Sequence, residues 1–474
     1  MISPCAMARD STTVKGVWWL EHQPNDRWQG EVTYGPTSGA ELDLFGYPHE
    51  AFDDASLERR FTLHGLTFKN KPVSLFECLI ARSEINLPGE RSCRINSASG
   101  VVGGHYHSLD EIAFKTAQAR LTGLREWVWA SGLRVTPATN PQGITASYRV
   151  PEAIPLGVCG PLSLWLEASG NVQPDFFSLQ IEEDWVLVIE ADQMRPYKMF
   201  EESIKVFQRF LCLAVQRPVY AMQITVRIDQ PKGVVQNTPT LEELVIIRRI
   251  SLKDWNRQKL ISQDLLFTSH ELGTSPANAF GRFAERQTKL EASMDLYIST
   301  IYNETQLPRV KFLALAQSLE AYHRARFSGK YMTDADYQAG LRKRLWEAVT
   351  SDNEPIDSDF RASLSTKLNY LHEFSLKKRL KEIARKHRGI LEPLIGDPDT
   401  FSKTVSDLRN TLTHPGEDGS GGDDDFRKVW RLSEMMALLL EVCFLDEIGF
   451  PEARITQIIL NRSRRAYRVH RGWV

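Results

Sequence analysis

The spacing of apolar residues changes near residue 280, and this change restricts the chain to a two-part architecture. Before this point, short segments rich in β-branched and aromatic residues are bounded by Gly, Pro or Asp, which is typical of antiparallel strands. After it, apolar residues recur every three or four positions, as on the buried face of a helix. The sequence therefore predicts an α+β multidomain fold, with a β-sandwich-like, mainly β domain at 14–280 and an all-α helical bundle at 300–474.

The N-terminal domain is expected to be an antiparallel sheet folded into a sandwich or a barrel. Its predicted strands span 14–20, 29–35, 40–46, 60–68, 71–80, 143–150, 160–168, 176–182, 185–191, 220–228 and 241–251. Two helices are predicted among them, at 110–130 and 198–216. A further division of this domain near residue 150 is an alternative that the sequence leaves open.

The C-terminal domain is expected to be a bundle of amphipathic helices with short connections. The predicted helices span 309–327, 361–374, 375–391, 400–412 and 426–450. The last of these is apolar on nearly every side, so it is expected to be buried in the bundle. An acidic, glycine-rich segment, 416–425, precedes it and is predicted to be a surface loop that could gate a neighbouring cleft.

Charge and cysteine content exclude several classes of protein. The formal net charge is −2, so a nucleic-acid-binding surface must be a local patch. The six cysteines are scattered without a CxxC pair, which argues against a disulfide framework or a zinc site. The chain has no run of about 18 apolar residues and no signal-peptide pattern, so we expect a cytoplasmic protein without a membrane segment.

The most informative short segment is RNTLTH, residues 409–414, at the end of a predicted helix. Arg409 and His414 are five positions apart, roughly 140° around an ideal helix, but Pro415 biases His414 away from helical geometry and frees its ring. Arginine offers a planar fork to phosphate oxygens, and histidine exchanges a proton near neutral pH. Asn410 could orient either group. The same residues also fit the polar end of an ordinary helix.

Several segments of the chain, RNTLTH among them, resemble a known family. RNTLTH resembles the R-N-x3-H form of the motif of the HEPN superfamily, whose all-helical domains include many endoribonucleases. The segment FLALAQSLEAYHRARF (312–327) is similar to the first core helix of HEPN domains that follow an ApeA-type N-terminal domain. QGEVTYGPTSGAELDLFG (29–46), KPVSLFEC (71–78) and LREWVW (124–129) resemble that N-terminal domain. The resemblance covers roughly residues 14–445 and preserves the order of the domains.

The resemblance implies a metal-independent endoribonuclease without a cofactor. Arg409 and His414 would act on the scissile phosphate, and Asn410 would support them. Members of the family generally pair, so the resemblance also implies a homodimer or larger homo-oligomer whose two motifs line one cleft. It implies a toxin-like role in anti-phage defence by abortive infection, in which host RNA, such as tRNA, or phage RNA is cut after a phage-derived trigger.

Two further groups of polar residues could assist such a site. Glu320 and His323, in the predicted helix 309–327, either face Arg409 and His414 or form a surface Glu–Arg pair and a solvent-facing histidine. The C-terminal segment carries a set of arginines among aromatic residues: Arg462, Arg464, Arg465 and Arg468. These arginines are expected either to contact the RNA backbone or to belong to a solvated tail or a subunit contact. A basic stretch at 377–388 is expected to be a solvated helix face, with an extension of a positive RNA track as the alternative.

The N-terminal half contains two weaker patterns. His105 and His107 lie close to Asp110 and Glu111, but no third, separated ligand accompanies them, so we predict no metal site. The acidic residues Glu182, Glu183 and Asp184 leave a carbohydrate-active enzyme as an alternative, because such enzymes need two carboxyl groups. A non-catalytic RNA- or ligand-binding interaction protein is the principal alternative to the endoribonuclease.

Overall fold

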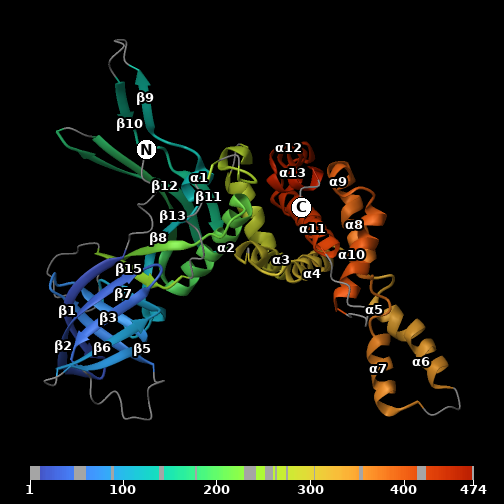
Figure 1. Ribbon diagram of the computed structural model, residues 1–474, viewed down its shortest axis with the longest axis horizontal. Coiled ribbons are helices and arrows are strands. Elements are labelled where there is room, and N and C mark those ends of the chain that lie inside the picture. The colour runs from blue at the N-terminus through green and yellow to red at the C-terminus, as the bar shows by residue number, and fades with distance from the viewer. Residues whose placement is uncertain are drawn as a thin grey trace. The chain divides into compact units, whose positions relative to one another are not determined.

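The computed structural model divides the chain into two compact units, Met1–Ala284 (unit 1) and Glu285–Val474 (unit 2), shown in Figure 1. It describes residues 11–46, 60–86, 90–137, 144–176, 179–228, 242–250, 260–261, 264–273, 276–303, 305–351, 356–413 and 423–471. Unit 1 is mainly β and unit 2 is helical, which confirms the predicted fold class.

The described residues of unit 1 form one large antiparallel sheet, together with α-helices and short 3₁₀ turns. Its strands are β1 (Thr12–Leu20), β2 (Gln23–Gly35), β3 (Gly39–Phe45), β4 (Phe61–Thr67), β5 (Pro72–Asn86), β6 (Glu90–Ser97), β7 (Ser99–Val102), β8 (Ala113–Leu121), β11 (Ile154–Cys159), β12 (Leu162–Pro174), β13 (Leu179–Pro196), β14 (Ala221–Ile228) and β15 (Glu242–Arg248). A separate hairpin joins β9 (Leu133–Pro137) and β10 (Ile144–Tyr148). The helices are α1 (Leu124–Val128) and α2 (Tyr197–Val215), with 3₁₀ turns η2 (Leu109–Glu111) and η5 (Ser269–Leu272).

Part of this sheet closes into a barrel. The strand order β5-β4-β1-β2-β3-β6 returns on itself because β6 also pairs with β5, and these strands form the blue barrel of Figure 1. Side chains alternate across each strand, so Trp18, Leu20 and Leu63 fill the core. Gly65 lies opposite Trp18, and a Cβ there would come within 2.3 Å of the indole. A side chain at this position would therefore displace the ring that fills the barrel.

The rest of the sheet runs in the order β7-β15-β14-β8-β13-β12-β11. Helix α2 packs against β8 and β13. Its predicted apolar stripe is buried, including Phe200, Ile204 and Phe207, so the prediction of a helix at 198–216 is confirmed.

The predicted helix at 110–130 is wrong for most of its length. Residues Ala113–Leu121 form β8, which pairs with β13 on one side and with β14 on the other. Ala117, Ala119 and Leu121 are buried at alternate positions. Alanine, glutamine, lysine and arginine favour helices in isolation, but pairing with two neighbouring strands outweighs that preference.

The helices of unit 2 are connected mostly by short segments. They are α4 (Pro308–Arg326), α5 (Asp334–Asp336), a π-helical turn η6 (Tyr337–Arg342), α6 (Lys343–Thr350), α7 (Ser358–Leu368), α8 (Leu376–Lys386), α9 (Arg388–Ile395), α10 (Pro398–Thr413), α11 (Asp423–Ile448), α12 (Glu452–Arg462) and α13 (Arg464–Arg471). Helix α3 (Pro276–Tyr302) begins in unit 1 and ends in unit 2. The single helix predicted at 375–391 is two helices, because the chain leaves helical geometry at His387.

Helix α11 is buried as predicted, but it also carries buried carboxylates. Glu434 lies 2.8 Å from Arg465, 2.8 Å from Arg468 and 2.9 Å from Lys311. Glu441 lies 2.8 Å from Arg465 and accepts a hydrogen bond of 2.9 Å from the Tyr297 hydroxyl. Burial opposes the charge of Glu434, but the three cations outweigh burial and lower its pKa to about 2. Burial raises the pKa of Glu441.

Among the described residues, no helix is both long and apolar enough to cross a membrane. The described cysteines are free thiols, and burial raises the pKa of Cys78 to about 12.

Candidate active site

The predicted RNTLTH segment begins in the last turn of α10. This helix packs against α8 and α4, with Phe401, Val405 and Leu408 buried. Because side chains three or four positions apart share a helix face, this buried stripe turns Asn410 towards solvent and leaves Arg409 half-buried.

Arg409 has few partners at the end of α10. Its Nη1 donates a long hydrogen bond of 3.4 Å to Oδ1 of Asn410. The Thr413 hydroxyl donates to the carbonyl oxygen of Arg409 at 2.9 Å, which satisfies one of the unpaired carbonyls of the helix end. Within the described part of the chain, no carboxylate forms an ion pair with Arg409. Apart from Asn410, no described side chain occupies its guanidinium donors.

His414 lies outside the described residues, as does segment 414–422, which includes most of the predicted loop at 416–425. The pairing of Arg409 with His414 and the gating role of the loop therefore stay predictions.

A groove of about 440 Å³ lies between α9, α10 and α11. It is lined by Ile395, Thr400, Phe401, Thr404, Arg427, Lys428, Arg431, Leu432 and Met435. The three cations are exposed, and none has a carboxylate partner among the described side chains. An apolar floor with a basic rim suits a ligand that combines flat apolar rings with phosphate groups. Arg409 lies five positions after Thr404, roughly 140° around α10, so it faces away from this groove.

Glu320 and His323 do not reach Arg409 in the described structure. Glu320 pairs with Arg324 at 3.1 Å, the surface pair that was the alternative prediction. His323 is fully buried instead of facing solvent. Its Nε2 donates to Glu382 at 2.8 Å, and its Nδ1 accepts from Arg379 at 3.2 Å. Burial lowers the pKa of His323, so the ring is a neutral bridge between α4 and α8.

Arg379 is a structural residue that the sequence analysis missed. Its side chain is buried and donates to the carbonyl oxygen of Phe374 at 2.9 Å and to Glu373 at 3.2 Å. Gly329 has a positive φ of 60°, and a Cβ there would come within 2.4 Å of the Arg379 guanidinium. One feature of the sequence indicated that Arg379 is buried: it lies between Leu376 and Leu380 on the apolar stripe of α8.

The C-terminal arginines differ in their burial and in their partners. The side chain of Arg465 is only 15% exposed and holds α13 to α11 through Glu434 and Glu441. Its predicted contact with RNA is therefore revised, since its donors already serve buried carboxylates. Arg468 also binds Glu434 and lies over the ring of Trp430. Arg464 is exposed, and the side chain of Arg462 lies outside the description.

The basic stretch at 377–388 is largely paired within unit 2. Lys381 and Arg385 lie 2.7 and 3.1 Å from Asp399, and Lys386 lies 2.7 Å from Asp446. These pairs favour a solvated, ion-paired helix face over an RNA track.

The acidic residues that suggested a carbohydrate-active enzyme have structural partners in unit 1. Glu183 accepts the backbone N–H of Gly132 at 2.8 Å, and Asp184 lies 2.8 Å from Arg120. Glu182 accepts from Gln180 at 2.8 Å. Because successive residues of a strand point to opposite faces, Glu183 and Asp184 do not form a facing pair.

Two comparisons identify the parts of the chain. The family model of the ApeA N-terminal domain 1 matches residues 13–281. The model of the Apea-like HEPN domain matches residues 313–454, which include most of α4, all of α10 and α11, and the RNTLTH segment. No curated protein and no solved structure matches the chain.

Proposed function

The chain belongs to the family of the ApeA N-terminal domain and carries an ApeA-like HEPN domain, and on this premise we propose that it is a metal-independent endoribonuclease of anti-phage defence. The observation that carries the proposal is the half-buried Arg409 at the end of α10, which has no described carboxylate partner. An arginine with available donors, followed within five residues by a histidine, suits the recognition and cleavage of a phosphodiester.

The proposed reaction uses the nucleophile that RNA itself provides. A base removes the proton of the 2′-hydroxyl, and the 2′-oxygen forms a bond to the adjacent phosphorus. The bond from phosphorus to the 5′-oxygen breaks, and an acid protonates that oxygen. The products are a 2′,3′-cyclic phosphate and a 5′-hydroxyl. His414 acts as the base or acid, and Arg409 stabilises the charge that develops on the phosphoryl oxygens.

One RNTLTH segment supplies one histidine, whereas the reaction needs both a base and an acid. A homodimer formed through unit 2 supplies two histidines and two arginines to one cleft. In this proposal Asn410 orients the phosphate or the imidazole through its amide. His323 supports the site only indirectly, by bridging α4 and α8, which pack against α10, and Glu320 pairs with Arg324 on its own helix.

The groove between α9, α10 and α11 is proposed to hold the RNA outside the cleavage centre. Arg427, Lys428 and Arg431 would neutralise phosphates along the groove, whose floor is apolar. Arg464 and Arg468 could extend this contact, although Arg468 shares its charge with Glu434.

Replacing Arg427, Lys428 and Arg431 together by alanine is expected to weaken RNA binding and to flatten its dependence on salt. Each phosphate contact contributes roughly 0.7 to the slope of log K against log[salt] for a single strand, so losing three contacts should reduce the slope by about 2. Fluorescence anisotropy of a labelled single-stranded RNA between about 50 and 200 mM salt measures this slope.

A control variant replaces three exposed cations outside the groove, Arg344, Lys367 and Lys403. Its net charge equals that of the groove variant, so it corrects for the overall field of the protein. Equal salt slopes for the two variants would contradict a role for the groove.

The experiment that tests the proposed activity is the cleavage of bacterial RNA in EDTA by purified wild-type protein and by Arg409→Ala. Loss of the guanidinium is expected to slow cleavage by about 10²–10³-fold, the usual cost of removing a donor that stabilises transition-state charge. Arg409→Lys keeps the charge without the planar fork, so its cleavage rate should lie between those of wild type and Arg409→Ala. Lys403→Ala, an exposed cation on the same helix, should cleave like wild type.

Wild-type protein that binds RNA but cuts none in the presence or absence of phage extract would favour the non-catalytic alternative. We propose that unit 1 restrains the nuclease until a phage-derived trigger acts, and that the activated protein works in the cytoplasm as a toxin that aborts infection.

A further inference from the structure

Three side chains lie next to one another on the outer face of the barrel in unit 1. Trp19 of β1 is in register with His64 of β4, and His64 is in register with Ser74 of β5. Their neighbours Trp18 and Leu63 point into the core, so the alternation of a strand turns these three outward. They are nevertheless buried, because the segment 103–108 that follows β7 covers them.

Hydrogen bonds around Ser74 determine the tautomer of His64. The Ser74 hydroxyl donates to the carbonyl oxygen of Gly104 at 3.3 Å, since that oxygen can only accept. The hydroxyl oxygen then accepts from the backbone N–H of Tyr106 at 3.0 Å and from Nδ1 of His64 at 2.9 Å. The proton of His64 is therefore on Nδ1, and Nε2 carries a free lone pair. Burial, with the neighbouring His105, lowers the pKa of His64 to about 4, so the ring is neutral at physiological pH.

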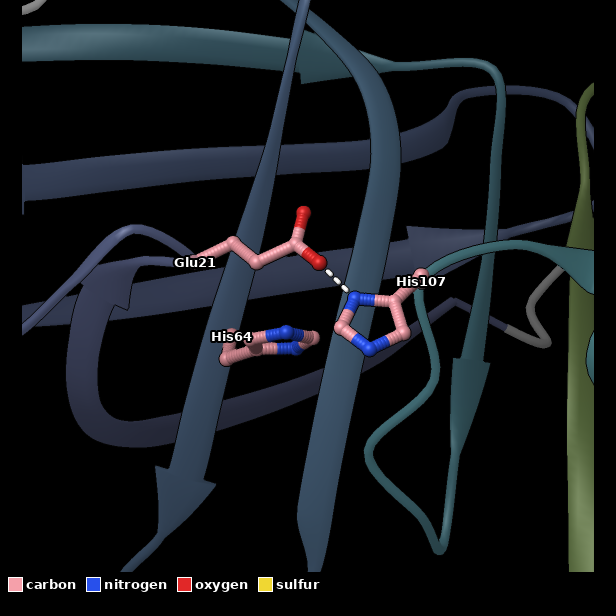
Figure 2. A group of neighbouring side chains, drawn as sticks. All are labelled: Glu21, His64 and His107. Atoms are coloured by element: carbon pink, nitrogen blue, oxygen red, sulfur yellow. Dashed lines mark ion pairs between the residues drawn. The ribbon is translucent and has the colours of Figure 1, made fainter.

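Two exposed or half-exposed side chains converge on His64. Glu21 lies in the tight turn between β1 and β2, and His107 lies in the covering segment. Figure 2 shows the Glu21 carboxylate directed at Nδ1 of His107, with the His64 ring beside them. One ligand atom from each of the three residues lies within 4.8 Å of the other two.

We propose that Glu21, His64 and His107 form a binding site for a divalent transition-metal ion of the Zn²⁺ class. Two imidazole nitrogens and one carboxylate oxygen are a donor set that such ions prefer, whereas Mg²⁺ and Ca²⁺ prefer oxygen ligands alone. Ligands about 2 Å from a common ion lie roughly 3–3.5 Å apart in tetrahedral geometry. The exposed side chains of Glu21 and His107 can make that small adjustment around the fixed ring of His64.

The surroundings match those of a protein metal ligand. The hydrogen bond from Nδ1 of His64 to Ser74 orients the ring and fixes its tautomer, as outer-sphere partners of metal-bound histidines do. Glu111 holds the segment by accepting the backbone N–H of His107 at 3.3 Å. His105 is not among the proposed ligands. Its Nε2 is hydrogen-bonded to the carbonyl oxygen of Gly65 at 2.9 Å, and its ring packs on Trp19.

A bound ion would fasten the segment 103–108 to the turn after β1. Three protein ligands also leave at least one coordination position for water or for an external ligand. The site is thus a place where unit 1 can take up a metal ion and present it to an anionic or nitrogen-donor ligand. The cleavage chemistry proposed for unit 2 uses no metal, so the two proposals can fail independently.

The test uses the full-length protein without a histidine tag, stripped with EDTA and dialysed. Isothermal titration with Zn²⁺ and the visible spectrum of the Co²⁺ form measure binding. We expect one Zn²⁺ per chain for wild type and at least about tenfold weaker binding for His107→Ala and for Glu21→Gln. Both replaced side chains are at least partly exposed, so these variants should fold even if a His64 variant does not.

His22→Ala is the matched control, because His22 is an exposed histidine adjacent to Glu21 that does not belong to the group. It should bind Zn²⁺ like wild type, and Mg²⁺ should bind to none of the proteins. Absence of Zn²⁺ and Co²⁺ uptake by wild type would overturn the proposal, and so would equal affinity in wild type and His107→Ala. Glu21 and His107 would then be an ion pair only.

Discussion

Replacement of Arg465 by alanine is expected to lower the free energy of unfolding of unit 2 by about 3–5 kcal/mol, the usual cost of removing one partner from a buried ion pair. The change would leave Glu441 in a buried position with only the Tyr297 hydroxyl as its hydrogen-bond donor among the described contacts. Glu434 would retain Lys311 and Arg468. Hydrogen exchange of the amides in α11 measures the effect, and exchange should accelerate at least about a hundredfold.

The loss of unfolding free energy caused by Arg465→Ala should also depend on pH. Burial already raises the pKa of Glu441, and loss of Arg465 removes the cation that opposes this shift. A carboxyl group whose folded pKa is raised destabilises the fold as the pH rises above its unfolded pKa. The loss of stability should therefore be larger at pH 8 than at pH 5.

Arg464→Ala provides the control, because Arg464 is an exposed neighbour on the same helix. Its effect on exchange in α11 should be within about 0.5 kcal/mol. If Arg465→Ala left exchange unchanged and weakened only RNA binding, the original expectation of an RNA contact would be restored and the structural role rejected.

His414→Ala is expected to reduce RNA cleavage by about 10²–10⁴-fold, because the variant loses the group proposed to transfer the proton. RNA affinity should be nearly unchanged, since the groove cations and Arg409 remain. Single-turnover cleavage with excess protein separates the chemical step from binding.

The histidine of α13, His470, is exposed, and His470→Ala should cleave at the wild-type rate. In a dimer with a composite site, mixing Arg409→Ala and His414→Ala subunits tests whether the two segments share a cleft. Full activity of His414→Ala in single-turnover experiments would exclude this residue as the base or acid.

The sequence predicted the architecture because hydrophobic period is a local property. The barrel strands β1 to β5 and the helices α2, α4, α10 and α11 were predicted from their own residues, but β6, which closes the barrel, was not. The prediction failed at Ala113–Leu121, where a composition suited to a helix is overruled by hydrogen bonds to two strands. One of these, β14, lies about a hundred residues later in the chain, so no local pattern could indicate the pairing.

Prediction of the polar sites was limited in the same way, because it used residues that are close in sequence. Arg409 and His414 were proposed as a pair because they lie within one short segment. The partners of His323 are Glu382 and Arg379, which lie on another helix, so the sequence could not distinguish a buried bridge from a catalytic aid. Glu21, His64 and His107 come from three separate segments, and only the closed barrel brings them together. His107 was considered as a ligand, but its partners were sought in the adjacent acidic residues.

The most direct test of the central claim is the chemistry of RNA ends in phage-infected bacteria that express wild-type protein or His414→Ala. Infection supplies the proposed trigger, so a dormant enzyme is not mistaken for an inactive one. The proposal predicts new fragments with 2′,3′-cyclic phosphate and 5′-hydroxyl ends in cells with wild type, and their loss with His414→Ala. Fragments that carry 3′-hydroxyl and 5′-phosphate ends, or identical fragments with both proteins, would contradict it.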